Sequence, residues 1–213
     1  MRGLIGHPLG HSFSKLIHEK INGFTYELLD YSKEEAVDLL KSKNFHALNV
    51  TIPYKHTVIE YLDQMDSISK ATGTVNTIVN RNGLLYGYNT DYFGFKYLIK
   101  NNKVFLQNKN VLILGTGATS NTVYKVCKDL KAAKVSKVSR HKQTNVFTYD
   151  EVLTNKTLLN NVQIIINTTP VGMYPNIDNS PIDLEGFSSL EAVVDVVYNP
   201  YKTKLLFYNI HII

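Results

Sequence analysis

The feature that most constrains the fold is an apolar run, residues 111–114, that leads into a short glycine-containing segment. The run enters Gly115-Thr116-Gly117-Ala118-Thr119-Ser120, and apolar residues at helical spacing follow. A strand, a glycine turn and a helix in this order are typical of the phosphate-binding loop of dinucleotide-binding α/β domains. Gly115 permits the tight turn, and Gly117 lets the backbone approach a pyrophosphate at the helix N-terminus. The third position of G-x-G-x-x-G is Ser120, so the motif alone is weak support for a nucleotide site.

The segment after the next predicted strand, residues 135–138, indicates which dinucleotide to expect. Enzymes that bind NAD usually have an acidic residue there, which holds the ribose hydroxyls. This chain instead has Ser139 and Arg140, with Lys142 nearby. Positive charge at this point suits a 2′-phosphate, so we expect NADP rather than NAD. A basic surface turn is the alternative interpretation.

In the first half, the segment Asn49–Lys55 (NVTIPYK) follows an apolar, strand-like run over residues 45–50. Pro53 has no backbone N–H, so it cannot continue a sheet ladder. Thr51 and Lys55 therefore present a hydroxyl and an ammonium at a strand tip, where they can orient a hydroxylated or keto substrate and exchange a proton with it. A strand end with a solvated surface lysine is the alternative.

Other polar residues of this half stand at positions where a ligand is one of two interpretations. Ser12 and Ser14 precede a helix-like run, and they predict either a seat for a carboxylate or plain helix capping. Asn76 lies inside the predicted strand 74–79, where its amide binds a ligand or a backbone group. Asp91 falls near a helix start, where it is a cap or the partner of Lys55 in a proton relay.

The order of elements predicts an α/β chain with parallel strand pairing, because strands and helices alternate. The Asn82-Gly83 pair predicts a hairpin between residues 74–79 and 84–88. The polar segment Lys100–Asn110 is interpreted as a linker, so we expect domains at residues 1–100 and 101–213. Thr203 is interpreted as the cap of a further helix.

Composition restricts the function classes. The formal net charge is +5 without a block of like charges, which does not indicate nucleic-acid binding but favours an anionic substrate or a phosphorylated cofactor. Cys127 is the only cysteine, so we expect a reducing compartment and a small buried thiol. No run is long enough for a membrane span, and His7, His11 and His18 lack metal-ligand spacing. We expect a soluble cytoplasmic protein without a metal.

Taken together, these stretches resemble the shikimate dehydrogenase family. Its G-x-P-x-x-H-S-x-S-P segment is matched at residues 6–14, with Lys15 where proline is usual, and its N-V-T-x-P-x-K segment at Asn49–Lys55. Its A-x-x-x-G-A-x-N-T segment is matched at residues 71–77, with Thr74 in place of the commoner alanine, and its G-x-N-T-D segment at residues 87–91. Further family segments are matched in the right order at residues 115–120, 139–142, 167–173 and 195–206.

The resemblance implies an N-terminal substrate domain and a Rossmann-type NADP domain, with the active site in the cleft between them. It implies NADPH-dependent, reversible reduction of 3-dehydroshikimate to shikimate by a monomer or homodimer. By the resemblance, Lys55 and Asp91 are the catalytic pair, and further residues bind the substrate: Ser12, Ser14, Thr51, Asn76 and Tyr198. It places the following residues at the cofactor: Gly115, Gly117, Ala118, Thr119, Ser139, Arg140, Lys142 and Thr168.

One departure concerns the end of the chain. The family continues for several dozen residues beyond the segment matched at 195–206, whereas residues 207–213 resemble none of that part. We therefore expect the C-terminal helices to be missing, with weak activity, poor solubility or a partner over the gap. The alternatives are a quinate/shikimate dehydrogenase of relaxed specificity and a remnant that binds ligand without turnover. A Rossmann methyltransferase suits neither Asn49–Lys55 nor the basic strand tip.

Overall fold

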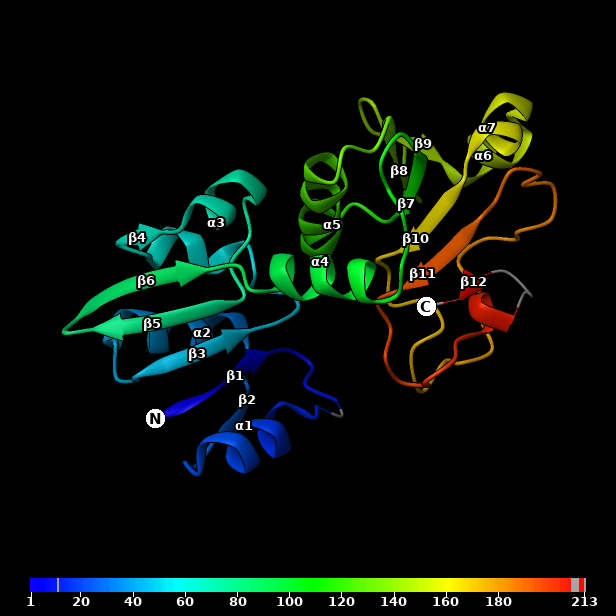
Figure 1. Ribbon diagram of the computed structural model, residues 1–213. Helices are drawn as coiled ribbons and strands as arrows, with labels where there is room; N and C mark the ends of the chain where they lie inside the picture. Colours follow the sequence, from blue (N-terminus) through cyan, green and yellow to red (C-terminus); the bar gives the residue numbers. More distant parts are fainter. Residues whose placement is uncertain (11, 208–210, 213) are drawn as a thin grey trace. The chain divides into compact units, whose positions relative to one another are not determined.

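The computed structural model describes residues 1–10, 12–207 and 211–212. The chain divides into two units, Met1–Asp91 and Tyr92–Ile213, and each contains a six-stranded sheet (Figure 1). The sequence predicts a boundary after residue 100, near the end of helix α4 (Asp91–Asn101), whereas the two units divide after its first residue, Asp91. All of α4 except Asp91 belongs to the second unit, in which the Tyr92 hydroxyl donates a hydrogen bond to Asp129 Oδ2, 2.7 Å away.

The first unit has a mixed sheet in the order β2-β1-β3-β5-β6-β4. Its strands are β1 (Arg2–Gly6), β2 (Glu27–Asp30), β3 (Ala47–Val50), β4 (Gln64–Met65), β5 (Thr77–Arg81) and β6 (Leu84–Tyr88). Its helices before α4 are α1 (Ser14–Asn22), α2 (Lys33–Ser42), the 3₁₀ turn η1 (Thr57–Tyr61) and α3 (Ser67–Thr72). As predicted, β1 pairs in parallel with β2 and β3, whereas β5 runs antiparallel to β3 and β6.

Local sequence signals explain several of these boundaries. Ser32 and Glu35 form a complete capping box at the start of α2. Gly73 ends α3 in a left-handed conformation. Asn82 and Gly83 have φ angles of 53° and 86°, which is the geometry of a tight two-residue hairpin.

The antiparallel hairpin decides where the polar residues of this unit meet. Because β5 runs against β3, the start of β5 lies beside the end of β3. The Asn76 N–H donates to Tyr88 O, and the Val50 N–H donates to Asn76 O. Asn76 was predicted inside a strand, but it lies just before β5, between the ends of β3 and β6.

The second unit has an all-parallel sheet in the order β12-β11-β10-β7-β8-β9. Its strands are β7 (Asn110–Leu114), β8 (Lys134–Ser139), β9 (Phe147–Thr148), β10 (Ile164–Asn167), β11 (Ala192–Asp195) and β12 (His211–Ile212). Its helices after α4 are α5 (Ala118–Asp129), α6 (Tyr149–Thr154), α7 (Lys156–Asn161) and the 3₁₀ turn η2 (Lys204–Phe207). Numbered within the unit, the order is 3-2-1-4-5-6, that of dinucleotide-binding Rossmann folds.

The central strands of the second unit are buried, and the helix predicted after Thr203 is shorter than expected. All residues of β10 and β11 are buried, as expected of parallel strands covered on both faces, and Cys127 is buried as predicted. Thr203 directly precedes η2, which is a single 3₁₀ turn and not the longer helix that was predicted. Its hydroxyl donates to Asp195 Oδ2 at 2.7 Å. Among the described residues, no helix has the length and hydropathy needed to cross a membrane.

Candidate active site

Lys55 and Asp91 form an ion pair in the first unit. The distance between Lys55 Nζ and Asp91 Oδ2 is 2.6 Å, and the two side chains are 14% and 37% exposed. Lys55 follows the turn after β3, and its carbonyl accepts a hydrogen bond from the Val75 N–H. Asp91 is the first residue of α4. The structure thus brings together two residues that lie 36 positions apart in the chain.

The Asn76 side chain holds the other oxygen of Asp91. Its amide nitrogen donates to Asp91 Oδ1 at 2.7 Å and to Thr90 Oγ1 at 2.9 Å. Its amide oxygen accepts the Thr90 N–H at 2.9 Å. Ammonium, carboxylate and amide therefore lie next to one another at one edge of the sheet, which is a suitable set of donors and acceptors for a hydroxyl or keto group.

Thr51 follows the carboxyl end of β3, and Ser12 and Ser14 come after the carboxyl end of β1. Because β1 and β3 are parallel neighbours, these two strand ends lie at the same edge of the sheet. A Cβ at Gly6 would lie 2.4 Å from Thr51 Cγ2, so this glycine makes room for Thr51. Ser14 begins α1, and Ser12 Oγ accepts the Ser14 N–H at 3.2 Å. The N-cap position itself is occupied by Phe13 without a side-chain cap, so the serine contact with the helix start comes from Ser12, one residue earlier. His11 lies outside the described residues.

The glycine loop of the second unit has the geometry that a phosphate group needs. Gly115 has a φ of +108°, and a Cβ there would lie 2.9 Å from Thr168 Oγ1. Gly117 is the N-cap of α5 without a side-chain cap, and its Cβ position has no neighbour within 4 Å. The first N–H groups of α5 thus have no side-chain cap at Gly117, and such groups can bind an anion. Ser120 is buried and donates to Gly115 O at 2.7 Å, so the serine closes the loop internally.

The residues after β8 differ from one another in their surroundings. Ser139 is buried, and its hydroxyl oxygen accepts from the His141 N–H and from Gln143 Nε2. Arg140 is exposed. Lys142 instead forms an ion pair with Glu151. Hydrogen bonds from Lys142 and from the Thr148 N–H lower the pKa of the Glu151 carboxyl.

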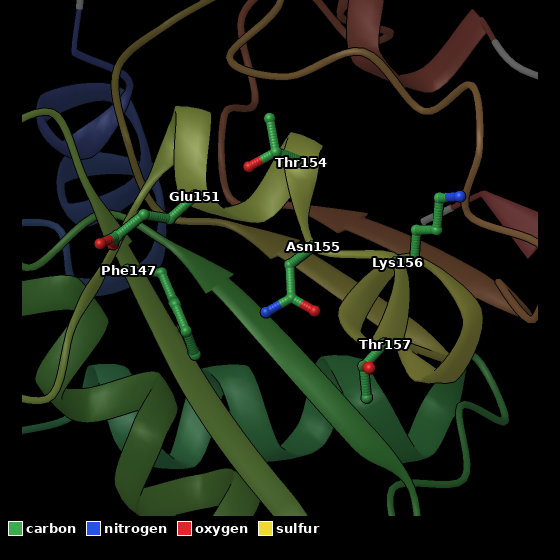
Figure 2. A pocket seen from close by; sticks show the side chains of 6 residues that line it. All are labelled: Phe147, Glu151, Thr154, Asn155, Lys156 and Thr157. Carbon is green, nitrogen blue, oxygen red and sulfur yellow. The ribbon is translucent and has the colours of Figure 1, made fainter.

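Glu151 also lines a hollow of about 580 Å³ over α6 and α7, together with Phe147 and residues 154–157. Figure 2 shows the Glu151 carboxylate pointing away from Asn155 and Thr157. The hollow contains none of the residues predicted to bind a ligand. It is open to solvent at the surface of the unit, so we assign it no ligand.

At the ends of β10 and β11, side chains hold the backbone in place. Thr168 donates its hydroxyl to Leu114 O at 2.6 Å, and Tyr198 is 62% exposed. Asp195 accepts from Asn167, Thr203 and the Val197 N–H, and burial raises the pKa of its carboxyl. This network was not predicted from the sequence; the available signal was a polar residue, Asn167 or Asp195, at the end of each of two apolar runs.

Comparison with known proteins places these features in one family. Residues 4–78 match the family model of the shikimate dehydrogenase substrate-binding domain. The chain is 38% identical to the shikimate dehydrogenase (NADP(+)) of Clostridium beijerinckii over an alignment of 220 residues. The alignment covers 96% of this chain and 80% of that protein. The chain belongs to the shikimate dehydrogenase family.

Solved structures of shikimate dehydrogenases have the same fold. Shikimate dehydrogenase 1 of Peptoclostridium difficile is 33% identical with a TM-score of 0.86, over 96% of this chain and 80% of that one. The Thermus thermophilus enzyme, solved in complex with NADP(H) and shikimate, is 27% identical with a TM-score of 0.79, over 93% and 79%. The predicted family and the predicted α/β fold are confirmed.

Proposed function

We propose that this chain catalyses the NADP-dependent, reversible reduction of 3-dehydroshikimate to shikimate. The observation that carries the proposal is the Lys55–Asp91 ion pair, 2.6 Å long, with Asn76 holding the second carboxylate oxygen. The pair lies in a unit whose residues 4–78 match the substrate-binding domain of the family. The reaction belongs to the shikimate pathway.

Lys55 exchanges the proton of this reaction, and Asp91 supports it. Bound NADPH supplies the hydride, which reduces the ring carbonyl carbon. The carbonyl oxygen then needs one proton, and the Lys55 ammonium donates it; in the reverse direction Lys55 removes the proton from the hydroxyl. Asp91 keeps the ammonium in place and accepts a hydrogen bond from a ring hydroxyl.

The remaining substrate contacts come from residues at the same sheet edge. Ser12 and Ser14, at the start of α1, hold the substrate carboxylate through hydroxyl groups and helix N–H groups. Thr51 and Asn76 hold ring hydroxyls. Tyr198, which is exposed after β11, stays a predicted substrate-binding residue.

The second unit fits NADP. The open space at Gly117 accommodates the pyrophosphate, with Gly115, Ala118 and Thr119 forming the loop around it. Ser139, Arg140 and Lys142 would bind the 2′-phosphate, with Lys142 contributing less because it is paired with Glu151, and Thr168 holds the tip of β10 beside the loop. The cytoplasmic location and the monomeric or homodimeric state stay predictions.

The proposal is tested by NADP-linked absorbance with shikimate. Lys55→Ala should lower kcat by about 100- to 10,000-fold, the usual contribution of a positioned proton donor. Lys43→Ala is the matched control, because Lys43 also pairs with an aspartate, Asp63, at 3.2 Å. Turnover that survives in Lys55→Ala would remove the catalytic assignment.

A panel of substrates separates the alternatives. Comparable turnover of quinate would identify an enzyme of relaxed specificity. Shikimate binding without turnover in the unmodified chain would identify a remnant that only binds ligand.

A further inference from the structure

A continuous chain of side-chain hydrogen bonds leads away from the catalytic pair through the first unit. Asn76 Oδ1 accepts from Thr77 Oγ1 at 3.1 Å. Thr77 Oγ1 in turn accepts from Asn49 Nδ2 at 3.2 Å. Asn49 Oδ1 accepts from the Tyr26 hydroxyl at 2.6 Å. The chain crosses β3 and β5 and ends at the residue before β2.

All the hydrogen bonds of this side-chain network are donated in the same direction, from Tyr26 towards Asn76. At one end the Thr90 N–H, which can only donate, fixes Asn76 Oδ1 as an acceptor. Thr77 can therefore donate to Asn76 and accept from Asn49, which leaves Asn49 Oδ1 to accept from Tyr26. Burial raises the pKa of the Tyr26 hydroxyl, so this hydroxyl remains a donor at working pH. Every link is satisfied only if the Asn76 NH₂ group faces Asp91.

Tyr26 also connects this chain to the helix that carries Ser14. Its ring stacks on His18 of α1, with centroids 4.4 Å apart and planes 2° apart. Its N–H donates to Glu19 Oε1, also on α1, at 3.1 Å. Tyr26 is 2% exposed, so one buried residue contacts both α1 and the polar chain.

We propose that Tyr26 and Thr77 are positioning residues, which hold the Asn76 amide in the orientation that supports Asp91 and Lys55. Neither touches the reacting atoms; both act through Asn49 and Asn76. The inference rests on the proposed function for its kinetic readout. It also has a structural readout that does not need turnover.

Three variants test the kinetic part. Thr77→Val removes the hydroxyl at nearly constant shape and should lower kcat about tenfold, with KM changed by less than about twofold, because a misaligned catalytic group slows the reaction more than it weakens binding. Thr77→Ser keeps the hydroxyl and should restore kcat to within about twofold. Tyr26→Phe, two links further away, should lower kcat about threefold.

Tyr54→Phe is the matched control for Tyr26→Phe. Tyr54 is also buried in this unit, but its hydroxyl donates to the carbonyl of Tyr31 at 2.7 Å, outside the chain. It should keep the kcat of the unmodified protein. Equal losses in Tyr54→Phe and Tyr26→Phe, or no recovery in Thr77→Ser, would overturn the proposal.

The second readout is the side-chain amide signal of Asn76 in nitrogen-15 NMR spectra. Thr77→Val should accelerate solvent exchange of this amide about tenfold, since the oxygen of the amide loses one of its donors. If the unmodified chain lacks turnover while the amide responds in this way, the proposed function fails and the positioning role is supported. If the chain turns over and the amide signal is the same in all variants, the positioning role is overturned.

Discussion

At the scale of single residues, two cations that follow β8 have different charge environments. Lys142 is paired with Glu151, whose second carboxylate oxygen accepts the Thr148 N–H in the capping box of α6. Glu151 is thus held by the helix start as well as by the lysine. Arg140, two residues earlier, is exposed. We therefore expect Arg140 to contribute most of the attraction for the 2′-phosphate.

This difference predicts the effect of removing each charge. Arg140→Met should weaken binding of adenosine 2′,5′-bisphosphate roughly 10- to 100-fold, the loss of one charge-assisted hydrogen bond. Lys142→Met should change it by less than about twofold, because Glu151 already offsets this charge. Calorimetric titration measures both, with adenosine 5′-monophosphate as the control ligand. Equal losses in the two variants would contradict this assignment.

The sequence contains enough information for some of these residues and not for others. A pair between Lys55 and Asp91 was one of two interpretations of a strand end and a helix start, and the family resemblance implied it as the catalytic pair. Glu151 was missed because an irregular segment separates it from Lys142, and its capping role gives no sign of a second partner. Thr77 looked like an ordinary strand residue, since a hydrogen-bond chain across β3 and β5 depends on register that the sequence does not show.

At the scale of elements, α4 and α5 are joined by one polar cluster. The Tyr92 hydroxyl, at the start of α4, donates to Asp129 at the end of α5. Asp129 also pairs with Lys125 at 2.6 Å, and this hydrogen bond lowers the pKa of its carboxyl. Burial and the nearby Asp129 carboxylate raise the pKa of Tyr92 from 10.0 to about 12.

The raised pKa predicts a loss of stability in alkali. Below pH 10 the phenol is protonated in both the folded and the unfolded chain, so its full contribution is present. Between pH 10 and about 12 the unfolded chain loses this proton first, so the contribution disappears as the pH rises. The free energy of unfolding should therefore fall more steeply over this range in the unmodified protein than in Tyr92→Phe.

Denaturant titrations at several pH values measure this difference. Tyr97→Phe is the control, because Tyr97 lies on the same helix and is 70% exposed. Identical slopes for the unmodified protein and Tyr92→Phe would refute the role of the buried phenol.

Element prediction worked best where one signal was strong. The hairpin at Asn82-Gly83 depends on local chemistry, and it was found where expected. The short elements β4, β9, α6 and α7 were not predicted, because segments of two to six residues have too little periodicity. The apolar residues Val58, Ile59 and Leu62 after Lys55 predict a helix, but the structure has only the 3₁₀ turn η1 there.

At the scale of the whole molecule, the net charge of +5 acts on the two ligands unequally. NADP has several negative charges and shikimate has one carboxylate. Long-range attraction to a positive protein is screened by salt. The composition of the sequence is enough to predict this positive electrostatic field. The strand order of each sheet required the structure, because the order of strands along the chain does not say which strands pair.

Raising the salt concentration from about 0.05 M to about 0.5 M should therefore weaken NADP⁺ binding about tenfold and shikimate binding less than about twofold. Fluorescence or calorimetric titration of each ligand alone measures the two dependences. A shikimate affinity that falls as steeply as that of NADP⁺ would argue against a general field as the cause.

The location of Lys55, Asn76 and Asp91 within the first 91 residues has a consequence for synthesis. Asp91 is the last of the three to leave the ribosomal exit tunnel, and by then Gly115 and Gly117 have been translated but still lie inside the tunnel. The first unit can therefore bring the three side chains together before the glycine loop is free to fold.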